Sequence, residues 1–125
     1  DKWETETVLS RTGYDLRDPK LSVTPKGELM VLMGCSLYKG GKLESTSTLV
    51  SFSKNGKKFS IPKPVNISSS ASQNFAWLWR VTWHKGTGYG VAYFKAGDQN
   101  KLELLATKRN RTRSNDTLRY FPLSQ

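Results

Sequence analysis

The spacing of apolar residues constrains the fold of this chain more than any other feature. Apolar side chains alternate with polar ones or form short runs bounded by Gly, Pro, Asn and Ser, and they do not recur at helical spacing. Leu21 and Val23 alternate with Ser22 and Thr24, and residues 29–33 form a continuous apolar run. The chain is therefore predicted to be all-β.

The first half of the chain is predicted to contain four strands. Residues 24–27 (TPKG) have the composition of a turn between the two segments above, and residues 46–52 are rich in β-branched side chains. Asn55-Gly56 is a strong hairpin signal. Beyond it, Phe59 and Ile61 alternate as a fourth strand that ends at the following prolines.

The second half repeats this order after a polar connection at residues 65–75. Residues 77–84 (WLWRVTWH) are predicted to form a strand, followed by a turn at 85–88 and by strands near 89–93, 102–106 and 118–121. Strict alternation divides the first of these strands into two faces. One face would carry Trp77, Trp79, Val81 and Trp83, and the other Leu78, Arg80, Thr82 and His84.

Two short segments mark an internal repeat. Residues 53–59 (SKNGKKF) and 114–120 (SNDTLRY) share the pattern Ser-x-(Asn/Asp)-x-x-x-aromatic and begin 61 residues apart. A period of this size with four strands in each unit is typical of propeller blades. The amide or acid is expected to bind backbone amides in a turn while the aromatic anchors the core. Two unrelated turns of this kind in a β-sandwich are the alternative.

These markers resemble a shortened Asp-box of the sialidase-like (BNR repeat) β-propellers. Residues 17–29 (RDPKLSVTPKGEL) resemble the sialidase segment Arg-Ile-Pro-x-Leu followed by Thr-x-x-Gly-x-Leu, and residues 77–84 with the later Gly-Tyr-Gly-Val resemble the next blade. The resemblance implies two four-stranded antiparallel blades of a six-bladed β-propeller. Residues 1–12 would be the outer strand of a preceding blade, 13–65 the first blade and 66–125 the second.

The resemblance also implies the site residues. Arg17 matches the family's first arginine, which binds the carboxylate of the sugar, and a guanidinium suits this role because it offers two parallel donors. The chain departs from the family at Asp18, where Ile is expected, and at Ser36, where a second arginine is expected. Asp18 is free to pair with Arg17 or a sugar hydroxyl. Glu44 is the acid nearest to the expected catalytic aspartate, so Asp18 and Glu44 are the catalytic candidates.

Other candidates have both a functional and an ordinary interpretation. Arg80 and His84 would line a substrate pocket or simply lie near the end of a strand. The tryptophans of residues 77–83 would stack on sugar rings or pack between blades. Cys35, the single cysteine, is predicted to be a small buried hydrophobe. One Cys and one His offer too few ligands for a metal site, and no cofactor motif is present.

The net charge of +10 favours an anionic partner. The leading hypothesis is a part of a sialidase-like glycosidase that removes terminal sugars of glycans, catalytic only within a complete propeller. A non-catalytic carbohydrate-binding or scaffold propeller is the alternative, which the serine at position 36 favours. A basic β-domain that binds nucleic acid through residues 108–113 (KRNRTR) is the third hypothesis.

The partners of the chain follow from its two-blade size. Two blades leave sheet edges and faces uncovered, so we expect association with the remaining blades or with further copies, three of which would close a ring. No run of apolar residues is long enough for a membrane span. The resemblance favours a secreted or periplasmic location.

Overall fold

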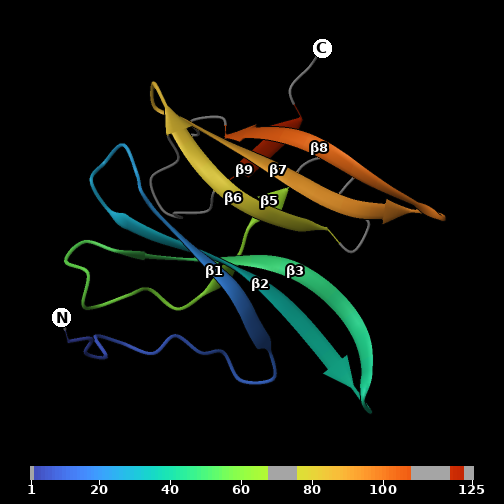
Figure 1. Cartoon of the computed structure of the whole chain (residues 1–125), viewed down its shortest axis with the longest axis horizontal. Coiled ribbons are helices and arrows are strands. Elements are labelled where there is room, and N and C mark those ends of the chain that lie inside the picture. The colour runs from blue at the N-terminus through green and yellow to red at the C-terminus, as the bar shows by residue number, and fades with distance from the viewer. Residues whose placement is uncertain (1, 68–75, 108–118, 123–125) are drawn as a thin grey trace.

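The computed structural model describes residues 2–67, 76–107 and 119–122, and it is all-β, with no helix among these residues. The first sheet has the order β1-β2-β3-β4, and its neighbouring strands are antiparallel. Figure 1 shows this sheet in its lower half. Its strands are β1 (Asp15–Val23), β2 (Leu29–Lys39), β3 (Lys42–Ser53) and β4 (Lys63–Pro64).

The second sheet has the order β5-β9-β8-β7-β6. Its strands are β5 (Asn66–Ile67), β6 (Trp77–His84), β7 (Thr87–Ala96), β8 (Gln99–Thr107) and β9 (Arg119–Pro122). The four strands from β6 to β9 are antiparallel neighbours, whereas β5 pairs with β9 in parallel. The predicted all-β class, with four consecutive antiparallel strands in each half, is confirmed.

Two short strands differ from the prediction. The last strand of the first sheet is β4 at Lys63–Pro64, not the segment around Phe59 and Ile61. Residues 57–62 instead run beside β3, joined to it by a hydrogen bond from the amide of Ser60 to the carbonyl of Phe52. β5 lies in the segment predicted to be a polar connection. The two sheets meet along the chain at Val65, between β4 and β5.

The turn after β3 has the expected side-chain hydrogen bonds. Oδ1 of Asn55 accepts hydrogen bonds from the amides of Lys57 and Lys58, both at 2.9 Å, and Gly56 has a φ of 73°. Phe59 then packs against the core beside β2 and β3. An amide in the turn and an aromatic anchor in the core are thus both present in the first marker. Residues 114–118 of the second marker lie outside the described residues.

A β-bulge in β6 overturns the predicted faces of this strand. Leu78 pairs with Ala92 and Val81 with Gly90, so one extra residue of β6 lies between these pairs. Leu78 and Val81 therefore both point into the core between the sheets, although they lie three positions apart in the sequence. The single tryptophan face predicted from strict alternation is wrong. Trp83 packs on this core, whereas Trp79 is exposed.

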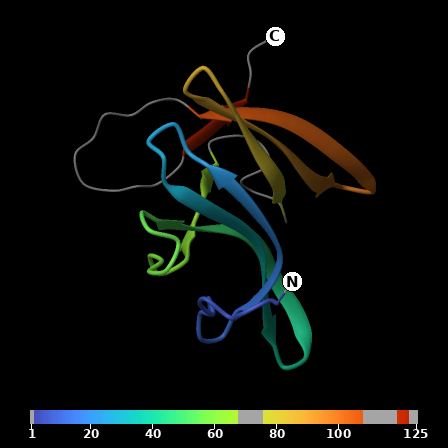
Figure 2. The same ribbon diagram turned by 60° about the vertical axis from the view of Figure 1, so that its left-hand side comes forward.

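The two sheets pack against each other through an apolar core and diverge beyond it. Strand β6 lies across β1, β2 and β3, while β7 and β8 lead away from the first sheet, as Figures 1 and 2 show. The opposite side of the first sheet packs on residues near the N-terminus and on Phe59. The core between the sheets contains Met30, Leu32, Val50, Leu78, Val81, Ala92 and Leu105.

The segment before β1 forms no strand at residues 2–12 in this chain. Its predicted role as the outer strand of a preceding blade concerns a blade that the chain does not contain, so it stays a prediction. In the described part of the chain, no helix is long and apolar enough to cross a membrane.

Candidate functional site

A bulge in β1 positions the first group of candidate residues. Arg17 pairs with Gly34 and Lys20 with Leu32, so Asp18 and Pro19 occupy the irregular step between them. Asp18 has a φ of 50°, a left-handed conformation that Asp tolerates better than most residues. Directly paired residues share a face of the sheet. Arg17 and Lys20 therefore both project on the face of the first sheet that carries β6.

Arg17 forms an ion pair on this surface, with a partner that the sequence analysis did not choose. Its Nε donates to Oδ2 of Asp15 at 2.8 Å, and its terminal nitrogen donates to the same oxygen. The hydrogen bond from Arg17 lowers the pKa of Asp15, and the same bond raises the pKa of Arg17. Asp18 contributes only its backbone carbonyl, which accepts a hydrogen bond from Lys20 at 3.5 Å.

Three aromatic side chains lie next to these charged groups. The rings of Trp77 and Tyr93 are stacked, with centroids 6.3 Å apart and 7° between their planes, and Tyr93 also meets Trp79 at 6.4 Å. The Trp77 indole lies directly over Gly34, the partner of Arg17 in the ladder. Trp77 therefore lies between the strand position that pairs with Arg17 and the ring of Tyr93.

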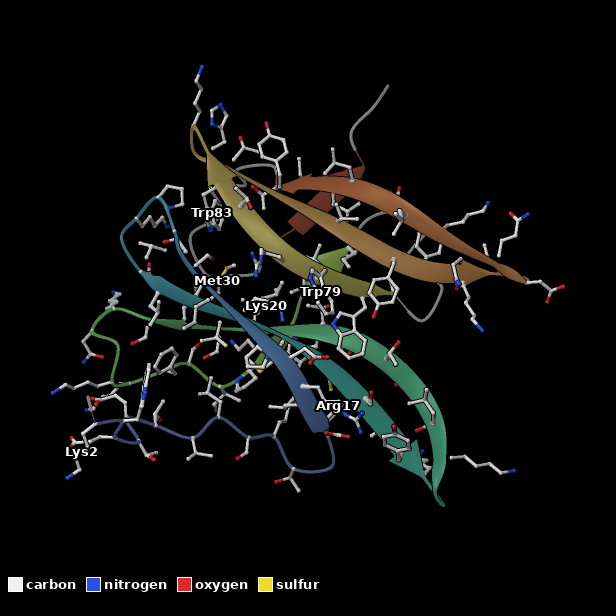
Figure 3. All side chains as sticks on the ribbon, viewed as in Figure 1. Lys2, Arg17, Lys20, Met30, Trp79 and Trp83 are labelled. Atoms are coloured by element: carbon white, nitrogen blue, oxygen red, sulfur yellow. The ribbon has the colours of Figure 1, made fainter. Side chains whose placement is uncertain are left out.

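Lys20 joins the two sets of residues. Its Nζ lies 4.5 Å from the centroid of the Trp79 ring, and Figure 3 shows these two side chains together where β1 passes β6. Trp79 and Tyr93 are 43% and 41% exposed, which leaves ring surface available to a ligand. We call this set the aromatic–cationic surface; it consists of Arg17, Lys20, Trp77, Trp79 and Tyr93.

The chemistry of this surface is that of recognition. The faces of aromatic rings carry negative potential, so they attract cations and the weakly positive C–H groups of a flat ligand. Lys20 and the terminal nitrogen of Arg17 that is not bonded to Asp15 supply donors for hydroxyl or carboxylate oxygens at the edge of such a ligand. No group of His, Cys, Asp or Glu among the described residues is arranged to hold a metal ion.

The two catalytic candidates are not brought together. Asp18 lies in the bulge of β1, whereas Glu44 lies on β3 and pairs with Nζ of Lys39 at 3.2 Å. Two strand spacings and about four residues of strand length separate them, which corresponds to roughly 15 Å between their backbones. The two carboxyl groups of a glycosidase lie about 5–10 Å apart.

The other binding candidates lie apart from Arg17. Arg80 is exposed in the bulge of β6 and forms no ion pair with another described residue. His84 is exposed at the end of β6, next to Trp83, whose Nε1 donates to Oγ of Ser22 at 3.2 Å. Ser22 is five residues along β1 from Arg17, a separation of roughly 15 Å. Arg17 and His84 therefore do not share one pocket.

Three residues of the site region were not predicted from the sequence: Asp15, Lys20 and Tyr93. Alternation along β7 predicts the face of the strand on which Tyr93 lies. The sequence does not indicate which residue of β6 lies opposite Tyr93. Lys20 reaches Trp79 only because a bulge rotates each strand. Of these three residues, only Asp15 could have been predicted from the sequence. It lies two positions before Arg17, and residues two positions apart in a strand project on the same face.

Comparisons with protein-family models, with curated proteins and with solved structures found no match to this chain.

Proposed function

We propose that this chain is a two-blade part of a sialidase-like β-propeller and that it binds a glycan without hydrolysing it. The observation that carries the proposal is the exposed Trp79 ring beside Tyr93, with the ammonium of Lys20 over it. A sugar ring would stack on the aromatic rings. Arg17 and Lys20 would bind its hydroxyl or carboxylate oxygens.

Several features of the fold support the propeller part of this proposal. In each sheet, a bulged strand, β1 or β6, forms a hairpin with the next strand, and the chain continues as an antiparallel meander. The sheets diverge from the contact at β6, as neighbouring blades do (Figure 1). The turn at Asn55 has the side-chain bonding expected of an Asp-box-like marker.

The separation of Asp18 from Glu44 supports binding rather than catalysis. Hydrolysis of a glycosidic bond requires an acid and a second carboxylate or tyrosine on one site. Glu44 already pairs with a lysine. A catalytic role in the parent protein would therefore depend on residues supplied by other blades.

Titration with a panel of sugars tests this function. We expect N-acetylneuraminate, glucuronate or a neutral oligosaccharide to shift the indole resonances of this protein in NMR spectra. Trp79→Ala should weaken the tightest of these interactions by about ten-fold or more, because stacking on an exposed ring contributes on the order of 1–3 kcal/mol. Trp3→Ala removes a tryptophan that is 96% exposed elsewhere in the chain, and it should change nothing.

The result opposed to this proposal is equally direct. If no sugar binds, or if Trp3→Ala weakens binding as much as Trp79→Ala does, the aromatic–cationic surface is not a glycan site. Release of the chromophore from chromogenic glycosides by the chain alone would instead show that it is catalytic.

The outer face of the second sheet is the part of the molecule that we propose to meet another blade. Val91 pairs with Leu104, and Tyr93 pairs with Leu102, on the side of β7 and β8 opposite the core. All four side chains are exposed, Leu102 by 76%. A contiguous apolar face of this kind is unusual on a solvent-facing sheet. Another blade, in the same longer protein or from a second copy, would cover Val91, Leu102 and Leu104 and leave the ring of Tyr93 to the aromatic–cationic surface.

A further inference from the structure

One end of the molecule collects lysines from three turns that are distant in sequence. Leu29 pairs with Ser53, so the turn at 24–28 and the segment 54–58 lie at the same end of the first sheet. The hydrogen bond from Trp83 to Ser22 brings the β6–β7 turn to this end as well. Figures 1 and 2 show these turns on the left of the molecule, away from the β2–β3 turn.

The side chains that these turns expose are positively charged. We call them the lysine end, which consists of Lys26, Lys54, Lys57, Lys58 and Lys85, all exposed. None of them forms an ion pair with another of the residues that the structure describes. Glu28, in the turn before β2, is half-buried. The segment before β1, which carries Glu4 and Glu6 together with Lys2, lies on the same side of the molecule (Figure 1). The lysine end therefore presents a strong excess of positive charge to solvent.

Part of this charge is held on a rigid turn. Asn55 binds the amides of Lys57 and Lys58, and Oγ of Ser53 accepts a hydrogen bond from the amide of Gly56 at 2.9 Å. These bonds fix the backbone that carries three of the five lysines. A preorganised backbone reduces the conformational entropy that is lost when a partner binds.

We infer that the lysine end binds an anionic polysaccharide, as a second surface distinct from the aromatic–cationic surface at the start of β1. Its charges are all ammonium groups on flexible stems, which suit carboxylates or sulfates spaced irregularly along a chain. Recognition by charge alone requires no pocket. The lysines span turns of both sheets, so the ligand has to be a polymer of several sugar units.

The same surface is poorly equipped for nucleic acid. Proteins that bind single strands stack bases on exposed aromatic rings. Among the described residues at this end, Trp83 is half-buried with its Nε1 bonded to Ser22, and Phe59 packs on the core. The exposed apolar side chains closest in sequence to these three turns, Val23 and Ile61, are aliphatic. An oligonucleotide is therefore expected to bind more weakly than a polysaccharide of similar charge density.

Binding to immobilised ligands tests this inference. The probes are heparin, polygalacturonate, neutral dextran and a single-stranded oligonucleotide, each at low ionic strength and at about 0.2 M salt. We expect heparin and polygalacturonate to bind, dextran to be inert, and binding to weaken steeply with salt. The triple variant Lys54→Gln, Lys57→Gln, Lys58→Gln should lose more than about ten-fold in affinity for both anionic polysaccharides.

A matched control separates the lysine end from the general charge of the protein. Lys42, Lys95 and Lys101 are exposed lysines toward the opposite end, and changing all three to Gln removes the same charge. This control should retain most of the affinity. Equal losses in both variants, tighter binding of the oligonucleotide, or no binding of either polysaccharide at low salt would overturn the inference. Sugar binding by Trp79 is measured separately, so the two surfaces are judged independently.

Discussion

At the scale of single residues, the closest packing in the site region joins Gly34 to Trp77. A Cβ atom at position 34 would overlap the six-membered ring of the Trp77 indole. Gly34 is buried in β2, with no positive φ, so the requirement for glycine arises from packing and not from backbone conformation. The absence of a side chain at position 34 is what allows the indole to pack against β2 at this point.

We therefore predict that Gly34→Ala destabilises the protein by about 1–3 kcal/mol, the usual cost of overpacking. Urea denaturation followed by tryptophan fluorescence measures this change in the free energy of unfolding. In a Trp77→Ala background the same substitution should cost much less, because the overlapping ring is gone. Equal costs in the two backgrounds would show that Trp77 does not occupy the space above Gly34.

Cys35 gives a prediction that depends on pH. Burial raises the pKa of its thiol above the ordinary 9.0, against a smaller opposing effect of a hydrogen bond with Ser47. The native thiol thus holds its proton to higher pH than the unfolded thiol does. The corresponding stabilisation is complete below pH 9.0 and is lost as the pH rises through the raised native value.

A thiol reagent at neutral pH should accordingly modify Cys35 only as fast as the protein opens. We expect modification to accelerate sharply when denaturant reaches the unfolding transition, because only the thiolate reacts and burial suppresses it. A thiol that reacts at the same rate in native and unfolded protein would contradict the burial of Cys35.

At the scale of structural elements, the turn after β3 depends on one amide side chain. Asn55→Ala removes an acceptor that satisfies two backbone amides, and we predict a loss of about 1–2 kcal/mol. Asn55→Asp keeps the oxygen and should remain close to the wild-type stability. Thermal unfolding by circular dichroism distinguishes them. If Asn55→Ala leaves the melting temperature unchanged, water satisfies these backbone amides equally well.

The sequence predicts the order of the long strands but not their bulges. Short apolar runs and turn residues are local signals, so the segments that became β1, β2, β3, β6, β7 and β8 are recognisable without knowing their partners. A bulge is a property of two paired strands. In β6 the sequence sign of the bulge is the spacing of the apolar residues Leu78 and Val81, which lie three positions apart. Strict alternation would place these two residues on opposite faces of the strand.

The shortest strands are unpredictable for a related reason. β5 consists of Asn66 and Ile67, and its partner in β9 lies more than fifty residues later in the chain. Two residues are too few to show alternation. β4 likewise depends on its pairing with β3. The carbonyl of Thr48 accepts a hydrogen bond from the amide of Val65, and this contact is tertiary, so no local sequence pattern predicts it.

The candidate site was predictable only in part for the same physical reason. Arg17 was identified from a contiguous motif, and its place on the surface follows from its own strand. The other residues of the aromatic–cationic surface are positioned by the way β6 crosses β1 and β2. This crossing places Lys20 beside Trp79 and Trp77 beside Tyr93. Such contacts between sheets carry no local sequence signal.

At the scale of the whole molecule, the two faces of the second sheet differ in a way that a single closed domain does not explain. One face is packed on the first sheet through Leu78, Ala92 and Leu105. The other exposes Leu102 and Leu104 together with Val91 and Tyr93. Burying such a face contributes about 25 cal/mol for each Å² removed from water. We propose that this free energy favours association with another blade.

The molar mass of the purified chain in solution, measured by light scattering, tests most directly whether these sheets are blades that require neighbours. We predict a mass that is a multiple of 14.1 kDa, with three copies as the ring-closing case, and a shift toward one copy in Leu102→Lys. Leu43→Lys, at an exposed leucine near the β2–β3 turn, should leave the mass unchanged. A monodisperse 14.1 kDa monomer that keeps its β-structure at high concentration would contradict the account.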